Sequence, residues 1–169
     1  TASIIHKPWN GQTYDPFETM VTWMKKADGT WFFDYTIFDR WVEFMMEIGI
    51  KKEITCYSMV PWRLSFQYYD QATNSLQEVK TKPGDKEFEE IWTAMLTSFA
   101  SHLKEKGWFG ITHISMDERP LDAMKETIRV IRKADPDFKI SLAGALHEEL
   151  SEFVDTRFYS NGAVEASCV

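Results

Sequence analysis

The stretch Ile111-Thr112-His113-Ile114-Ser115-Met116-Asp117-Glu118-Arg119-Pro120 places two adjacent carboxylates where an apolar run stops and a helix is expected to start. In parallel α/β folds, the carboxyl ends of the strands carry the ligand site. The sequence therefore predicts that Asp117 and Glu118 lie at the rim of a parallel sheet as catalytic residues. A helix cap is the alternative, because acidic residues beside Pro120 also suit the first turn of a helix.

Strands and helices alternate on both sides of this stretch. Short apolar runs predict strands at residues 2–6, 53–58, 111–116 and 138–143, with a further strand at 157–160. Three helices are expected between them, one after Asp34, one after Asp85 and one from Pro120, and a short one at 147–154. The first helix is expected to bury the residues that recur at helical spacing, which are Ile37, Trp41, Phe44, Met45 and Ile48.

The first two strands are followed by unusually long connections. Residues 7–33 are expected to form an irregular loop, with one or two helical turns at 17–25, and residues 63–82 to contain a hairpin. Such connections normally have roughly 2 to 6 residues, and long ones are usually functional. Because both follow strands, we expect them at the same end of the sheet as Asp117 and Glu118.

Alternation of this kind indicates an α/β fold with parallel strands and right-handed crossovers. This order of strands and helices is compatible with an open doubly wound sheet and with a closed (β/α)8 barrel. A complete barrel takes about 250 residues, whereas this chain has 169 and about five strands. We therefore predict an incomplete (β/α)8 (TIM) barrel segment in one domain, residues 1–169. Missing parts of the barrel or a partner chain would cover the sheet edges.

Composition excludes several classes of function. The chain is 44% hydrophobic, which suits a folded core, and its formal net charge of -7 argues against nucleic acid. No run approaches the roughly 20 apolar residues of a membrane span, and no targeting segment is apparent at the start. No Gly-rich phosphate loop and no pair of histidines at metal-ligand spacing occur, so no cofactor and no metal are expected.

Aromatic side chains near strand ends are candidates for sugar contact. Flat rings pack against the apolar face of a sugar, and tyrosine hydroxyls bind its polar rim. Four such residues, and one histidine just past the fourth strand, are predicted to bind substrate: Trp9, Tyr14, Tyr57, Trp62 and His147. Packing is the alternative for the loop aromatics. Trp41 and Trp92, on helical stripes, are expected in the core.

Four segments together resemble glycoside hydrolase family 123. They are Pro8-Trp9-Asn10-Gly11-Gln12-Thr13-Tyr14-Asp15-Pro16-Phe17, Cys56-Tyr57-Ser58-Met59-Val60-Pro61-Trp62, His102-Leu103-Lys104-Glu105-Lys106-Gly107-Trp108 and Met116-Asp117-Glu118-Arg119-Pro120. The resemblance covers residues 2–150 and implies a retaining, exo-acting β-N-acetylgalactosaminidase whose (β/α)8 barrel lies beside β-sandwich domains. The chain departs from the family pattern at Ala145-Leu146, where Asn-Tyr is expected before His147.

The resemblance also implies a mechanism, a substrate and a location. In substrate-assisted hydrolysis the sugar's own 2-acetamido oxygen attacks the anomeric carbon. Asp117 would then stabilise the acetamido group, and Glu118 would be the acid and base. The substrate would be a glycan or glycolipid-derived oligosaccharide ending in β-linked N-acetylhexosamine, and the protein would be secreted or periplasmic. Two alternatives stay open, a conventional glycosidase with a second carboxylate, Asp155 being the nearest candidate, and a carbohydrate-binding fragment without catalysis.

Overall fold

The computed structural model describes residues 1–9, 14, 17–144 and 147–158. Five strands form a parallel sheet in the order in which they occur along the chain: β1 (Ala2–Ser3), β4 (Ile54–Tyr57), β7 (Thr112–Asp117), β8 (Lys139–Ala143) and β9 (Thr156–Phe158). A doubly wound sheet would reverse this order at a switch point. The predicted alternation is confirmed, and the architecture is that of part of a (β/α)8 barrel.

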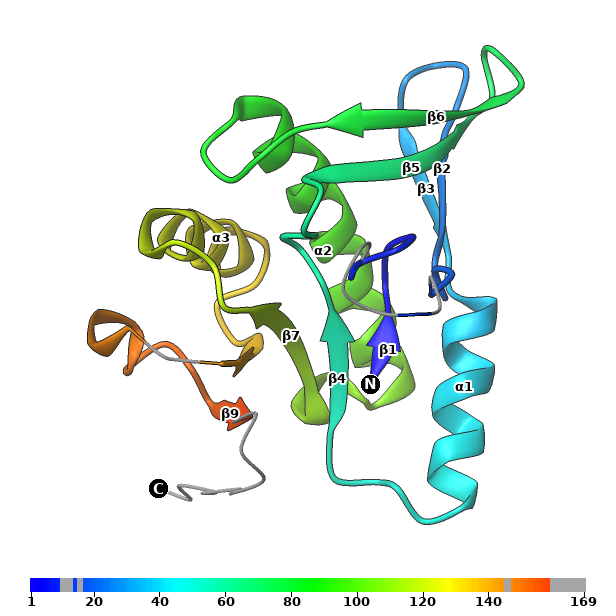
Figure 1. Cartoon of the computed structure of the whole chain (residues 1–169). Helices are drawn as coiled ribbons and strands as arrows, with labels where there is room; N and C mark the ends of the chain where they lie inside the picture. The colour runs from blue at the N-terminus through cyan, green and yellow to red at the C-terminus, as the bar shows by residue number, and fades with distance from the viewer. Residues whose placement is uncertain (10–13, 15–16, 145–146, 159–169) are drawn as a thin grey trace.

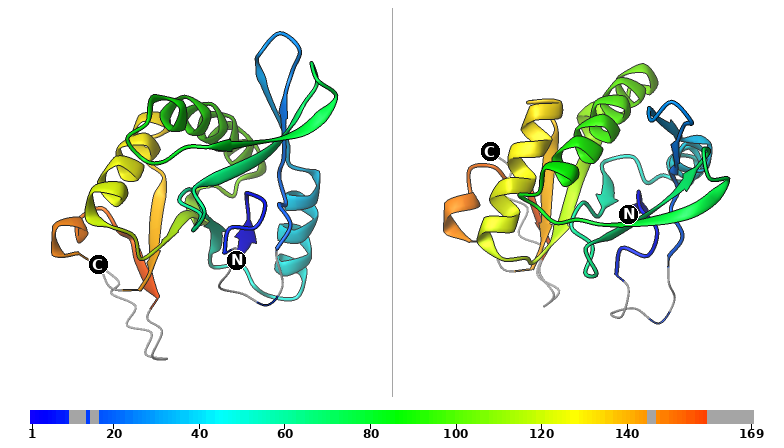
Figure 2. Two further views of the ribbon diagram at one scale, coloured as in Figure 1. Left: turned by 45° about the horizontal axis from the view of Figure 1, so that its top comes forward. Right: turned by 90° about the horizontal axis from the view of Figure 1, so that it is seen from above.

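Three helices cover the outside of these strands. Helices α1 (Thr36–Glu47), α2 (Lys86–Lys106) and α3 (Leu121–Ala134) form an arc around the sheet (Figure 2). Two short 3-10 helices, η1 (Phe109–Ile111) and η2 (Glu148–Leu150), lead into β7 and toward β9. Within the described ranges, no helix combines the length and the apolar character needed to cross a lipid bilayer.

Local sequence explains where the helices begin and end. Ahead of α1, the Asp34 carboxylate accepts hydrogen bonds from the backbone N-H of Thr36 at 2.8 Å and from its hydroxyl at 2.6 Å. At the end of α2, Gly107 adopts a left-handed conformation with φ 73°. There the N-H of Trp108 bonds the carbonyl of Leu103 at 2.8 Å. Glycine suits this position because it has no Cβ to clash.

The predicted burial of α1 is wrong in its direction. Phe38 and Val42 are the residues that α1 buries, while Ile37, Phe44 and Ile48 are 56%, 52% and 58% exposed. Trp41 is half-buried, whereas Trp92 on α2 is fully buried as expected. The helix is apolar on more than one side, and periodicity cannot tell which side meets the sheet, because tertiary packing decides this.

The two long connections are not irregular loops but form a second sheet. Its strands are β2 (Thr22–Lys25), β3 (Trp31–Asp34), β5 (Ser65–Asp70) and β6 (Ser75–Lys80), in the order β3-β2-β5-β6. The hairpin predicted within 63–82 is confirmed as β5 and β6, but the helical turns predicted at 17–25 are wrong. In Figure 1 this sheet lies beyond the carboxyl ends of the parallel strands.

Aromatic packing joins the second sheet to α2. The Trp92 ring meets Trp23 of β2 edge to face at 5.2 Å and Phe66 of β5 at 5.4 Å. The indole N-H of Trp23 also donates to the carbonyl of Ile4 at 2.8 Å, just after β1. Each aromatic pair contributes about 0.5–1.5 kcal/mol beyond burial. The sheet is therefore held firmly above the barrel strands.

The two faces of the parallel sheet differ in chemistry. Adjacent parallel strands align Thr55 with His113, and Ser115 with Ser141. Side chains alternate along a strand, so the outer face toward the helices carries Cys56, Ile114, Met116, Ile140 and Leu142, all of which are buried. The inner face is polar, and Asp117 is its last residue on β7.

Candidate active site

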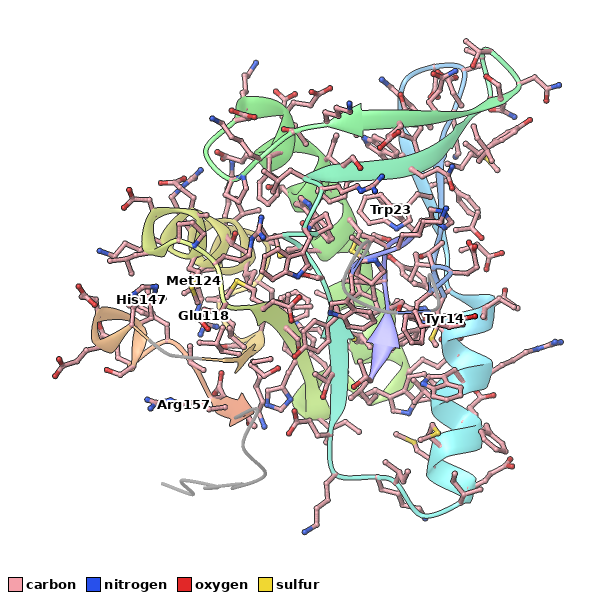
Figure 3. All side chains as sticks on the ribbon, in the orientation of Figure 1. Tyr14, Trp23, Glu118, Met124, His147 and Arg157 are labelled. Atoms are coloured by element: carbon pink, nitrogen blue, oxygen red, sulfur yellow. The ribbon has the colours of Figure 1, made fainter. Side chains whose placement is uncertain are left out.

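Asp117 and Glu118 lie together at the carboxyl end of β7, as predicted. Asp117 pairs in register with Ala143 on β8 and is half-buried on the polar inner face. Glu118 directly follows the strand, so the two side chains leave the backbone in different directions. Figure 3 shows Glu118 at the end of β7, in the region where α3 begins. The N-cap residue of α3 is Pro120, which makes no side-chain hydrogen bond to the helix.

Two tryptophans donate hydrogen bonds to Asp117. The indole Nε1 of Trp62 lies 3.2 Å from Asp117 Oδ2, and the Trp9 side chain donates a second bond. Burial raises the pKa of Asp117, while the two indole bonds and the charge of Arg119 act in the opposite direction. The carboxylate is thus fixed in place by donors from two separate loops. We call Trp9, Trp62 and Asp117 the indole cradle.

Arg119 lies against the indole cradle. Its guanidinium carbon is 4.6 Å from the centre of the Trp62 ring, a cation–π contact. Burial lowers the pKa of Arg119, and the nearby Asp117 charge opposes that shift. The Nε atom is buried and makes no hydrogen bond to any described residue. Arg119 therefore packs on the face of the Trp62 ring and keeps one buried donor, Nε, without a partner among the described residues.

Tyr57 extends the cluster from the end of β4. Its ring centre lies 5.2 Å from that of Trp9, and Trp9 in turn meets Phe17 edge to face at 5.2 Å. Burial, and then the negative charge of Asp117, raise the pKa of Tyr57. The peptide bond between Tyr57 and Ser58 is cis. Three of the predicted aromatic residues, Trp9, Tyr57 and Trp62, are therefore brought together around Asp117.

Glu118 lies against Gly144 at the end of the neighbouring strand. Gly144 has φ 107°, and a Cβ built on it would lie 2.9 Å from both Cβ and Oε2 of Glu118. Real Cβ atoms do not approach that closely, so only glycine leaves room for the glutamate in this position. The sequence alone hints at this role, because Gly144 follows β8 where Glu118 follows β7.

The other predicted binding residues are not joined to this cluster. Tyr14 is 99% exposed. His147 is half-buried and precedes η2, and Figure 3 places it in the segment that lies beside Glu118 in that view. Ala145 and Leu146, where the chain departs from the family pattern, lie outside the described residues.

Asp155 lies at the wrong end of the sheet for a nucleophile. It stands one residue before Thr156, which pairs with Ser141, whereas Asp117 pairs with Ala143 at the opposite end of β8. Its carboxylate accepts a hydrogen bond from the backbone N-H of Ile140 at 2.8 Å. The two carboxylates are therefore offset by roughly 10 Å along the strand direction, and they also belong to strands that are not neighbours.

No group of three or more His, Cys, Asp or Glu side chains in the described part of the chain could hold a metal ion. The site consists instead of two carboxylates, indole and guanidinium donors, and aromatic rings. Such a set can position a neutral polar ligand, accept hydrogen bonds from it and exchange protons with it.

Comparisons with known proteins show the family of this chain. Residues 1–167 match the family model described as glycoside hydrolase 123, catalytic domain. Among solved structures, the chain resembles a family 123 glycoside hydrolase from Clostridium perfringens that was studied for glycolipid glycan hydrolysis. The two are 37% identical with a TM-score of 0.86, and the match covers 94% of this chain and 30% of that one. The search of curated proteins gives no match. The chain belongs to glycoside hydrolase family 123.

Proposed function

We propose that this chain forms the catalytic centre of a retaining glycoside hydrolase that releases terminal β-linked N-acetylhexosamine, N-acetylgalactosamine in particular, by substrate-assisted catalysis. The observation that carries the proposal is the pair of consecutive carboxylates with different surroundings. Asp117 is held by indole donors, and Glu118 lies against Gly144. Two side chains that differ in this way can serve two atoms of one sugar ring.

The chemistry assigns one role to each carboxylate. Asp117 accepts a hydrogen bond from the acetamido N-H, which makes the acetamido oxygen more nucleophilic toward the anomeric carbon. As the bond between the acetamido oxygen and the anomeric carbon forms, the glycosidic bond breaks and Glu118 gives its proton to the leaving oxygen. Water then attacks the anomeric carbon, Glu118 takes its proton, and the ring formed with the acetamido group reopens. The anomeric configuration is retained because each of the two displacements inverts the anomeric carbon.

The aromatic residues suit the remainder of the sugar. The rings of Trp9 and Tyr57 lie 5.2 Å apart beside Asp117. The half-buried Trp9 ring offers an apolar surface to the C-H face of a pyranose, and the buried Tyr57 ring packs against it. The relative from Clostridium perfringens was studied for glycolipid glycan hydrolysis. We extend this to a glycan or glycolipid-derived oligosaccharide as the substrate here.

This chain spans about 30% of that relative's length. Within the described residues, β1 and β9 each pair on one side only. We propose that further strands complete the barrel beside them, since parallel sheets of this class are closed or covered.

Replacing Glu118 tests the proposal directly. Glu118→Gln removes the transferable proton, and we expect kcat on an oligosaccharide to fall about 10²–10⁴-fold. The loss should be much smaller on a dinitrophenyl glycoside, whose leaving group needs no proton. Asp117→Asn should lose activity on both substrates. Glu90→Gln, which changes an exposed carboxylate on α2, is the matched control. Undiminished turnover of the oligosaccharide by Glu118→Gln would refute the assignment.

Substrate analogues separate the alternatives. A conventional two-carboxylate glycosidase would hydrolyse glycosides that lack the acetamido group at comparable rates. A carbohydrate-binding protein without catalysis would bind N-acetylgalactosamine in a titration and turn over neither substrate.

A further inference from the structure

A polar pocket lies near the indole cradle, and none of its lining residues takes part in the chemistry proposed for Asp117 and Glu118. Its volume is about 180 Å³. It lies between the segment after β1 and the start of the β5–β6 hairpin. The polar residues that line it are His6, Lys7, Arg63, Ser65, Gln67 and Glu78.

The pocket adjoins the cradle because both use the same two segments of chain. Lys7 is two residues from Trp9, and Arg63 directly follows Trp62. The two segments are joined where the backbone N-H of Trp62 donates to the carbonyl of Pro8 at 3.4 Å. Consecutive Cα atoms are about 3.8 Å apart, so the pocket begins within one sugar unit of the cradle.

The hairpin supplies the polar wall of the pocket. Gln67 and Glu78 are opposite each other in the β5–β6 register, and Ser65 lies on the same face. Phe66 points the other way and is buried against Trp92 of α2. Packing therefore holds the apolar face of the hairpin rigid and turns its polar face toward the pocket.

The charges in the pocket favour an anion. His6 is paired with Glu18 at 2.6 Å. Lys7 and Arg63 form no ion pair or side-chain hydrogen bond with any described residue, and Glu78 is the one acidic residue among those that line the pocket. Two cations thus face one carboxylate, in a chain whose formal net charge is -7. Because Lys7 and Arg63 have no ion-pair partner among the described residues, their charges are available to an anionic ligand.

We propose that this pocket binds an acidic sugar unit, one that bears a carboxylate or a sulfate, in the same glycan as the hexosamine that is cleaved. The inference rests on the proposed function and names its substrate class more narrowly. The Arg63 guanidinium presents a planar fork that matches a carboxylate or sulfate, and Lys7 adds a point charge. Ser65, Gln67 and Glu78 bind the ring hydroxyls. The volume suits one pyranose ring.

Arg63→Gln in the natural full-length protein tests this proposal. Three oligosaccharides that end in β-N-acetylgalactosamine are compared. The first is neutral, the second carries a sialyl branch on the next sugar, and the third carries a sulfate ester on that sugar. The ratio of kcat/KM for an acidic substrate to that for the neutral one should fall at least about tenfold in Arg63→Gln. Arg40→Gln is the control, because Arg40 is an exposed arginine on the outer helix α1. The ratio should keep its wild-type value in that control.

The outcomes of this experiment are distinguishable. A loss confined to the sialylated or to the sulfated substrate supports the proposal and identifies the anionic group. An unchanged ratio in Arg63→Gln, with the neutral substrate still hydrolysed, overturns the inference and leaves the proposed function intact. If the wild type hydrolyses none of the three, the proposed function fails. Titration with the acidic oligosaccharides then tests whether the pocket binds them. Weaker binding by Arg63→Gln than by the wild type supports the inference, and equal affinity of the two proteins overturns it.

Discussion

The inner and outer faces of the parallel sheet differ in what their side chains do. On β7, Ile114 points outward and is fully buried beneath the helices, while Ser115 points inward and shares a hydrogen bond with Ser141 on β8 at 2.5 Å. Asp117 belongs to the inner face. One strand thus carries apolar core residues on one side and the polar residues of the candidate site on the other, because side chains alternate along the backbone.

This difference has a physical cause. The outer face excludes water and gains free energy from every apolar group it buries, at about 25 cal/mol per Å². The inner face ends at the mouth of the barrel, where polar groups must find partners or ligands. His113, Ser115 and Ser141 are buried there although they are polar. Such a face costs free energy on folding unless its buried polar groups find hydrogen-bond partners.

The largest effect on folding should come from the outer face. Ile114→Ala removes a fully buried side chain, and we expect the free energy of unfolding to fall by about 2–5 kcal/mol. The neighbouring change Ser115→Ala should lower it by only about 1 kcal/mol, because it removes one hydrogen bond. Urea denaturation of both variants makes the measurement. Equal losses would mean that the two faces contribute alike.

The next effect should appear in catalysis with little change in the fold. Gly144→Ala would bring a Cβ to 2.9 Å from Cβ and Oε2 of Glu118, and we expect the displaced carboxyl to lower kcat about 100-fold. Gly84→Ala is a matched control, because Gly84 has φ 97° with nothing within 4 Å of an added Cβ. A similar loss of turnover in both variants would assign the effect to backbone strain rather than to Glu118.

The smallest effect concerns the pH dependence of stability. Burial raises the pKa of Asp117 above its ordinary 3.8, so the folded protein binds this proton more tightly than the unfolded chain does. Stability should therefore decrease as the pH rises from 3.8 through the raised pKa. Asp117→Asn should remove this decrease and be more stable than the wild type near neutrality. Unfolding curves at a series of pH values would contradict the assignment if the two proteins changed in parallel.

Much of the fold and of the site could be predicted from local pattern. The strand before Asp117, the long helix ending at Gly107 and the hairpin at β5–β6 all have strong periodic or turn signals. The grouping of Trp9, Tyr57 and Trp62 near Asp117 followed from their positions after strands. Local patterns succeed here because strand ends in parallel sheets meet at one edge.

Other features depend on contacts between distant residues. The β2–β3 hairpin is predicted to be a loop, because the strand that stabilises it, β5, comes only after α1 and β4 in the sequence. Nothing in the spacing of Ile37, Phe44 and Ile48 tells that they point away from the sheet. Asp155 lies just before the strand predicted at 157–160, and the pairing of β9 with β8 places it three residues away from the level of Asp117.

The sequence by itself determined the alternation of strands and helices and the position of Asp117 and Glu118 at a strand end, because backbone periodicity and helix termini are local properties. Tertiary structure alone decided that Trp9 and Trp62 donate to Asp117, that Gly144 makes room for Glu118, and that Lys7 and Arg63 share a pocket. These arrangements join segments that lie far apart along the chain, and only the packing of the two sheets on a common core brings these segments together.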